Sequence, residues 1–189
     1  MKIILASSSP RRSELLRKLV ADFEIRIPEI DERLDRKKSA TANAEFLATE
    51  KARAVFEKNS VTIGGDTLGE LAGKILGKPR DKREAAEFLR ALAGKQHAVI
   101  SGFCVKTDER EIVGHAKSLV EFTNISDAAI EKYVAENPVE NFAAGYAIQS
   151  LPKNFVQKID GAAETVIGFP LQEIGKILRR LRVGQIELR

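Results

Sequence analysis

The sequence predicts an α/β (α+β) protein with one mixed, twisted sheet and flanking helices. Strand-like and helix-like segments alternate in the first half of the chain, and two longer segments with partial polar–apolar alternation follow in the second half. The chain has 189 residues, 43% of them hydrophobic, which is enough for a substantial core. Because no repeat or low-complexity linker interrupts it, we expect a single domain over residues 1–189, or two small lobes around a cleft.

The first half is expected to begin with a buried strand at Lys2 to Ala6. A helix should follow to about Leu19, because Ser9 is a favourable N-cap and Pro10 suits the first helical position. The remaining elements predicted here are a strand at 24–27, a helix at about 42–58 and a strand at 61–63 that ends in Gly64-Gly65-Asp66-Thr67.

The second half is expected to open with a hairpin that turns at Gly73. A helix follows in which Asp81 is the N-cap, Glu84 completes a capping box and Gly94 ends the helix. The other predicted elements are antiparallel strands at about 96–107 and 112–124, a helix at 126–136, a loop of small residues at 141–150, a hairpin of 155–159 and 164–167 around Asp160-Gly161, a helix from Pro170 to about Leu181 and a strand at 186–188.

The formal net charge of +4 favours anionic ligands such as nucleotides, phosphates or nucleic acid. A nucleic-acid-binding module would interleave aromatic residues with a basic stripe. Only 6% of the residues are aromatic, none is Trp, and the basic residues are spread along the chain. Nucleic acid is therefore not an expected partner.

Metal, disulfide and membrane chemistry are also restricted by composition. Cys104 is the single cysteine and there are two histidines, so neither an internal disulfide nor a Cys/His zinc site is expected. Any metal should be a hard cation held by carboxylates. No apolar run approaches the ~20 residues that span a membrane, and the apolar stretch at 1–6 is too short for a signal peptide. We therefore expect a cytoplasmic protein without a membrane partner.

The segment Ser7-Ser8-Ser9-Pro10-Arg11-Arg12 is the first candidate site, because it leads from a strand into a helix N-terminus. Free backbone N–H groups and the positive end of the helix dipole bind phosphates there. Two arginines in the first turn oppose that dipole, and an anionic ligand would explain them. The alternative is a capped helix with solvated arginines.

Two further candidates are Lys51 and Asp66. Lys51 lies on the apolar face of its predicted helix, four residues after Leu47, which is unusual unless the lysine snorkels to solvent or meets an anion. Asp66 directly follows a buried strand and two glycines that would let a ligand approach the backbone, as expected of a metal ligand or a base. A plain turn aspartate is the alternative.

Gly77-Lys78-Pro79 and the acidic pair Asp31-Glu32 are weaker signals, since such sequences also occur in ordinary turns and solvated loops. Together, however, the five segments supply basic groups for phosphates and carboxylates for a hard cation, and the chain offers no candidate Cys or Ser–His nucleophile. That set indicates metal-assisted attack of water on a phosphoanhydride.

The chain resembles the Maf family of septum-formation-inhibitor proteins, which are related to the Ham1/ITPase-type house-cleaning pyrophosphatases. The matching segments occur in family order over nearly the whole chain: Leu5 to Arg12 with Glu14-Leu15-Leu16, Glu50-Lys51-Ala52, Gly65-Asp66-Thr67, Gly77 to Asp81, Tyr146-Ala147-Ile148-Gln149 and Val166 to Leu171. The serine-rich opening combined with Gly-Asp-Thr is highly specific.

The resemblance implies an ITPase-like fold with two lobes around a nucleotide cleft, and hydrolysis of a nucleoside triphosphate to the monophosphate and pyrophosphate with Mg²⁺ or Mn²⁺. Members with the Tyr-x-Ile-Gln motif act on dTTP, UTP and modified pyrimidine nucleotides, and many form homodimers. The implied roles are Asp66 as general base or metal-bound carboxylate, Glu32 as a second metal ligand, Ser7, Arg12, Lys51 and Lys78 on the phosphates, and Arg11, Thr67 and Gln149 at the base.

The chain departs from the family pattern before Tyr146. The family usually has Glu-Pro and then Asp-Lys-Ala-Gly, whereas this chain has a run from Asn137 to Gly145 that looks one residue longer and lacks the lysine. Ser150 and Phe169 also replace the usual glycine and leucine. The segment 137–145 is expected to lie near the pocket for the base. A non-enzymatic regulator of cell division is the alternative function, and it would not require Asp66 or Lys51.

Overall fold

The computed structural model describes residues 1–181, and the predicted strand at 186–188 lies outside them. A mixed seven-stranded sheet forms its centre, in the order β2-β1-β3-β5-β6-β7 with β4 paired to β3. The strands are β1 (Lys2–Ala6), β2 (Glu24–Arg26), β3 (Ser60–Leu71), β4 (Lys74–Leu76), β5 (Gln96–Lys106), β6 (Glu111–Phe122) and β7 (Val156–Asp160). β1 is parallel to both β2 and β3, and the remaining pairs are antiparallel, so the predicted mixed sheet is confirmed.

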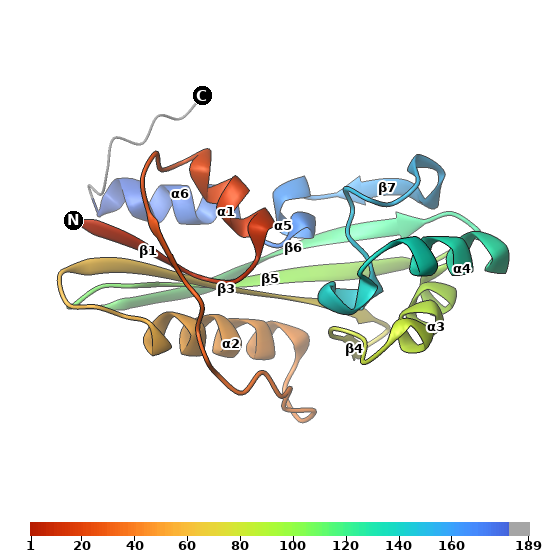
Figure 1. Ribbon diagram of the computed structural model, residues 1–189, viewed down its shortest axis with the longest axis horizontal. Helices are drawn as coiled ribbons and strands as arrows, with labels where there is room; N and C mark the ends of the chain where they lie inside the picture. The colour runs from red at the N-terminus through yellow and green to blue at the C-terminus, as the bar shows by residue number, and fades with distance from the viewer. Residues whose placement is uncertain (182–189) are drawn as a thin grey trace.

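Helices cover both faces of this sheet (Figure 1). They are α1 (Pro10–Arg17), α2 (Ala40–Ala54), α3 (Lys82–Leu92), α4 (Asp127–Glu136), α5 (Ala163–Ile167) and α6 (Leu171–Arg180), with three short 3₁₀ turns at Val139–Asn141, Ala143–Gly145 and Lys153–Phe155. In Figure 1, α2 lies on one side of the sheet, and α1 and α6 lie on the other.

Strand alternation assigns the core residues to the two faces. On one face, Ala98 and Ile100 of β5 pack with Ala40 and Ala44 of α2. On the other face there are two separate clusters: Phe103 and Val105 belong to the cluster under α1 and α6, whereas Val99 belongs to the cluster under α3 and α4. This second face therefore carries two packed regions side by side along the strands.

Local signals position most helices as predicted. Pro10 begins α1 after Ser9, although the Ser9 side chain makes no capping hydrogen bond. Asp81 caps α3 by accepting from the Glu84 amide at 2.8 Å. In a capping box, the Glu84 carboxylate would accept from the amide of the N-cap residue, Asp81. Here it accepts from the amide of Arg80, one residue before the N-cap, so only half of the predicted capping box forms.

Three boundaries differ from the predictions. α2 runs from Ala40 to Ala54, so it begins and ends earlier than the predicted 42–58, because Ser39 supplies the cap. β3 does not end before Gly64 but continues through Asp66 to Leu71. The predicted hairpin around Asp160-Gly161 is wrong: 156–160 pairs with β6, and 163–167 is the helix α5.

Candidate active site

Asp66 lies where β3 is unpaired along one edge. β1 pairs with β3 only as far as Gly64, and β4 pairs with it only from Gly69 onward. Between these points, no strand within residues 1–181 pairs with residues 65–68 of β3 on that side. Such a crevice, where a neighbouring strand ends, is where ligands reach an α/β sheet. Because successive side chains of a strand point to opposite faces, Asp66 faces α2 and Thr67 faces α1 and α5.

On the α2 face, Lys51 joins two carboxylates. Its Nζ lies 2.7 Å from Asp66 Oδ1 and 2.7 Å from Glu32 Oε1. The side chains of Lys51 and Asp66 are only 6% and 9% exposed, so this is a buried ion pair. Lys78, which is exposed, reaches the second oxygen of Glu32 at 3.1 Å. Of the two alternatives for Lys51, the structure shows contact with an anion, and that anion is Asp66; a contact with phosphate stays a prediction.

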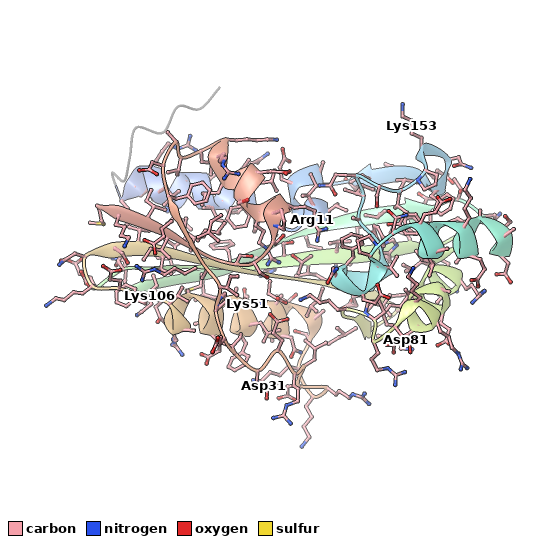
Figure 2. The ribbon with its side chains drawn as sticks, viewed as in Figure 1. Arg11, Asp31, Lys51, Asp81, Lys106 and Lys153 are labelled. Atoms are coloured by element: carbon pink, nitrogen blue, oxygen red, sulfur yellow. The ribbon has the colours of Figure 1, made fainter. Side chains whose placement is uncertain are left out.

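The electrostatics of Glu32 follow from these contacts. Partial burial raises the pKa of its carboxyl, but hydrogen bonds and charge attraction from Lys51 and Lys78 outweigh it and hold the pKa at about 2. Its neighbour Asp31 does not join the cluster, because both of its oxygens bind Arg33. The acidic pair is thus divided, and Glu32 alone faces the site. In Figure 2, Asp31 lies on the outer segment, away from Lys51.

On the opposite face, Arg12 ties α1 to the sheet. Its Nε donates to the Gly168 carbonyl at 2.8 Å, and its two terminal nitrogens donate to Thr67 Oγ1 at 3.1 Å and Ser7 Oγ at 3.3 Å. Ser7 Oγ also accepts from the Ser9 amide. Burial lowers the pKa of Arg12, and the charge of Asp66 opposes that shift. These contacts give Arg12 a structural reason to stand in the first turn of a helix.

The Thr67 hydroxyl belongs to a chain of hydrogen bonds that the sequence did not reveal. Ser101, its directly paired neighbour on β5, lies 2.9 Å away and donates its own proton to the Thr165 carbonyl at 2.8 Å. Since each hydroxyl has a single proton, Thr67 donates toward Ser101 or the Gly168 carbonyl and accepts from Arg12. The Thr67 oxygen is therefore held in a fixed orientation.

A cavity of about 500 Å³ connects these groups from the two faces of the sheet. Of the predicted site residues, it is lined by Arg11, Arg12, Glu32, Lys51, Asp66, Thr67, Lys78 and Gln149. Ser7 is buried behind Arg12 and does not line it. Gln149 is exposed at the rim. The rest of the wall includes Phe142, Ala144 and Tyr146, which form an apolar end beside the charged one.

The two glycines before Asp66 do not serve the predicted purpose. A Cβ on Gly64 would lie 2.1 Å from the Ala48 carbonyl oxygen of α2, and a Cβ on Gly65 would lie 3.3 Å from Arg12 Nε. They allow α2 and Arg12, and not a ligand, to approach the strand closely. Gly102 has the same role on β5, where a Cβ would lie 2.5 Å from the backbone of Ala44.

Among residues 1–181, no group of three or more His, Cys, Asp or Glu side chains is placed to hold a metal ion. Asp66 and Glu32 are the two carboxylates of the cavity, and both are hydrogen-bonded to Lys51. In the same part of the chain, no helix is long and apolar enough to cross a membrane.

Comparison with known proteins places this geometry in a family. A family model described as "Maf-like protein" matches residues 2–181. The chain is 38% identical over 180 residues to a dTTP/UTP pyrophosphatase of Acinetobacter baylyi, covering 94% of this chain and 98% of that protein. A protein of the same description from Aquifex aeolicus is 37% identical, and the match covers 97% of this chain and 97% of that protein. Another from Thermosipho africanus is 40% identical, and the match covers 94% of this chain and 92% of that protein. The chain belongs to the Maf family.

Proposed function

We propose that the protein is a pyrophosphatase that hydrolyses dTTP and UTP to the nucleoside monophosphate and pyrophosphate. The observation that carries the proposal is the buried Lys51–Asp66 pair, held by a rigid strand at the wall of a cavity that also has basic and apolar walls. Its relatives described as dTTP/UTP pyrophosphatases match nearly their full length. A non-enzymatic regulator would gain nothing from burying such a pair, because its desolvation is costly.

Basic groups surround the position for the triphosphate. Lys51 and Lys78 approach from the α2 side, and Arg12 lies across the strand. A triphosphate placed among them would compete with Glu32 and Asp66 for the two lysines, so these ammonium groups are available to neutralise phosphate charge. Ser7 supports this end indirectly, because its hydroxyl accepts from Arg12.

Asp66 is proposed as the general base. Its Oδ1 is occupied by Lys51, and the described residues donate no hydrogen bond to Oδ2, which leaves that oxygen for a water molecule. Water would attack the α-phosphorus and pass a proton to Asp66 while the bond to the bridging oxygen breaks, so that pyrophosphate leaves with both electrons of that bond.

A divalent cation, Mg²⁺ or Mn²⁺, fits the donor set. Mg²⁺ in phosphate-processing sites is commonly held by one or two carboxylates together with substrate oxygens and water. Glu32 and Asp66 are two such carboxylates, and each has a second oxygen that Lys51 does not contact. The cation would supply charge stabilisation of the phosphates.

The base of the nucleotide would occupy the apolar end of the cavity. Gln149 at the rim and Arg11 offer hydrogen-bonding groups there, and Thr67 lies on the floor. A pyrimidine ring fits a wall of aromatic and small apolar side chains with few polar groups.

The test is pyrophosphate release from dTTP, UTP, CTP and the purine triphosphates, with Mg²⁺, Mn²⁺ or EDTA. We expect metal-dependent release led by dTTP and UTP. Asp66→Asn should lose at least about a hundredfold in kcat, because the proton acceptor is gone. Asp31→Asn is the matched control, since its carboxylate is turned away, and it should retain activity. Full activity of Asp66→Asn would remove Asp66 from the mechanism, and no release from any nucleotide would favour the regulator.

A further inference from the structure

Arg11 lines the cavity and has no hydrogen-bond or ion-pair partner within residues 1–181. The residue is half-buried. Arg12, its neighbour, uses all three of its nitrogens on protein oxygens. Burial lowers the pKa of Arg11, because protein atoms replace part of the water that would stabilise its charge. An acceptor from outside the chain is the simplest reason for keeping it there.

Phe142 contacts this guanidinium through the face of its ring. The Arg11 Cζ lies 4.5 Å from the centre of the Phe142 ring, which is itself 8% exposed. An arginine stacked on a ring keeps its N–H groups in the plane of the guanidinium, where they remain free to donate. In Figure 2, Arg11 is labelled near the start of α1.

The segment around Phe142 is held by its own backbone. The Phe142 amide donates to the Val139 carbonyl at 3.1 Å, and its carbonyl accepts from Gly145 at 3.0 Å. The Ala144 amide donates to the Gly77 carbonyl at 2.9 Å, next to Lys78. Ala144 and Gly145 both have positive φ, at 56° and 77°, which fixes a tight turn. The backbone that carries the ring is thus held in one conformation.

We infer that Phe142 is a positioning residue for the pyrimidine base, acting through Arg11. This role rests on the proposed function: the Phe142 ring holds the Arg11 guanidinium so that its N–H groups point at a carbonyl of uracil or thymine. Cytosine carries an amino donor where these bases carry the acceptor O4, and arginine offers donors only, so the arrangement selects against cytosine. Phe142 lies in the segment from Asn137 to Gly145, where this chain departs from the family pattern.

The test compares Phe142→Leu and Phe142→Tyr with the wild-type enzyme. Leu keeps an apolar side chain but removes the ring, whereas Tyr keeps the ring. We expect Phe142→Leu to raise the KM for UTP about three- to thirtyfold, the value of one cation–π contact, with kcat changed less than about twofold. The UTP-over-CTP preference should fall by a similar factor, and Phe142→Tyr should restore both.

Two comparisons separate positioning from structural damage. In an Arg11→Met background, Phe142→Leu should change KM far less than it does alone, because only the ring's own contact with the base remains to be lost. Phe23→Leu is the matched control: Arg17 lies 5.6 Å over the Phe23 ring, and neither residue lines the cavity. Phe23→Leu should leave KM unchanged even if it lowers the melting temperature.

Equilibrium binding of UTP in EDTA keeps this test separate from catalysis. If wild-type protein releases no pyrophosphate but Phe142→Leu weakens UTP binding, the proposed function fails and the positioning role stands. The inference is overturned if folded Phe142→Leu keeps both the wild-type UTP affinity and the preference over CTP, or if its effect persists unchanged without the Arg11 guanidinium.

Discussion

Replacing Lys51 by Met should be the most destabilising single change in the site. Lys51 Nζ contacts Asp66 and Glu32, each at 2.7 Å. Glu32 is 42% exposed and would keep its ion pair with Lys78, so the loss of Lys51 would destabilise it little. Asp66 is 9% exposed and would be left as a buried carboxylate without its cation. Breaking a buried pair costs about 3–5 kcal/mol, and we expect about 3 kcal/mol because the cavity admits water to Asp66.

For a chain of this size, about 3 kcal/mol corresponds to a fall in melting temperature of roughly 6–12 °C. Asp66→Asn should cost less, about 1 kcal/mol, because Lys51 stays paired with Glu32 and the amide oxygen still accepts a hydrogen bond. The Lys51→Met/Asp66→Asn double variant should therefore be more stable than Lys51→Met alone, since it contains no unpaired buried charge.

Calorimetric or fluorescence melting of the four proteins at pH 7.5 measures these terms as a double-mutant cycle. The reasoning is refuted if Lys51→Met melts within about 2 °C of the wild type, or if the two substitutions add. Either result would mean that the buried pair contributes no coupling. Lys51 would then be retained for the nucleotide alone.

Three other predictions follow from the same structure. His97 is buried, its Nδ1 has no hydrogen-bond partner among the described residues, and burial lowers its pKa to about 4. Because the folded protein protonates His97 less readily than the unfolded chain does, the free energy of unfolding should be highest above pH 6.5 and fall by about 3 kcal/mol toward pH 4. His97→Phe should flatten the slope of unfolding free energy against pH in that window. Gly64→Ala places a Cβ 2.1 Å from the Ala48 carbonyl, so it should cost about 1–3 kcal/mol and reduce kcat by moving Lys51 from Asp66, whereas Gly73→Ala, with open space around it, should lower only the melting temperature. Mg²⁺ should raise the melting temperature of the UTP complex, and Glu32→Gln should reduce that gain if Glu32 holds the cation.

Elements with strong local signals could be predicted from sequence, and those decided by partners could not. Asp81 and Gly94 mark the two ends of α3 by local chemistry alone, through a side-chain cap and a positive φ of 68°. Asp160-Gly161 carries the same turn chemistry as a hairpin, and Gly161 does adopt a positive φ of 118°. The strand before it nevertheless pairs with β6, because that edge was available in the fold. A local turn signal cannot report which edge a strand will find.

The same limit applied to β3. Two glycines before Asp66 resemble a strand end, yet they are required because α2 and Arg12 pack directly against the strand. Nothing within ten residues of Gly64 reveals that approach. Arg12 likewise binds Gly168, 156 positions away, so the sequence showed its odd place in a helix N-terminus but not the partner that explains it. Lys51 was detectable because a lysine on an apolar helix face is unusual in itself.

The correction to β3 changes how the site works. Had Asp66 stood in a turn, its carboxylate would share the mobility of the loop. As part of a twelve-residue strand paired to β5 along this stretch, it has a fixed backbone and a side chain set by alternation. Asp66 and Thr67 therefore present the charged cluster and the hydroxyl chain on opposite faces of one strand, and the missing edge partner lets a single cavity reach both. Precise placement on a rigid element is what a base acting on a phosphoanhydride needs, since a displacement of about 1 Å can cost a hundredfold in rate.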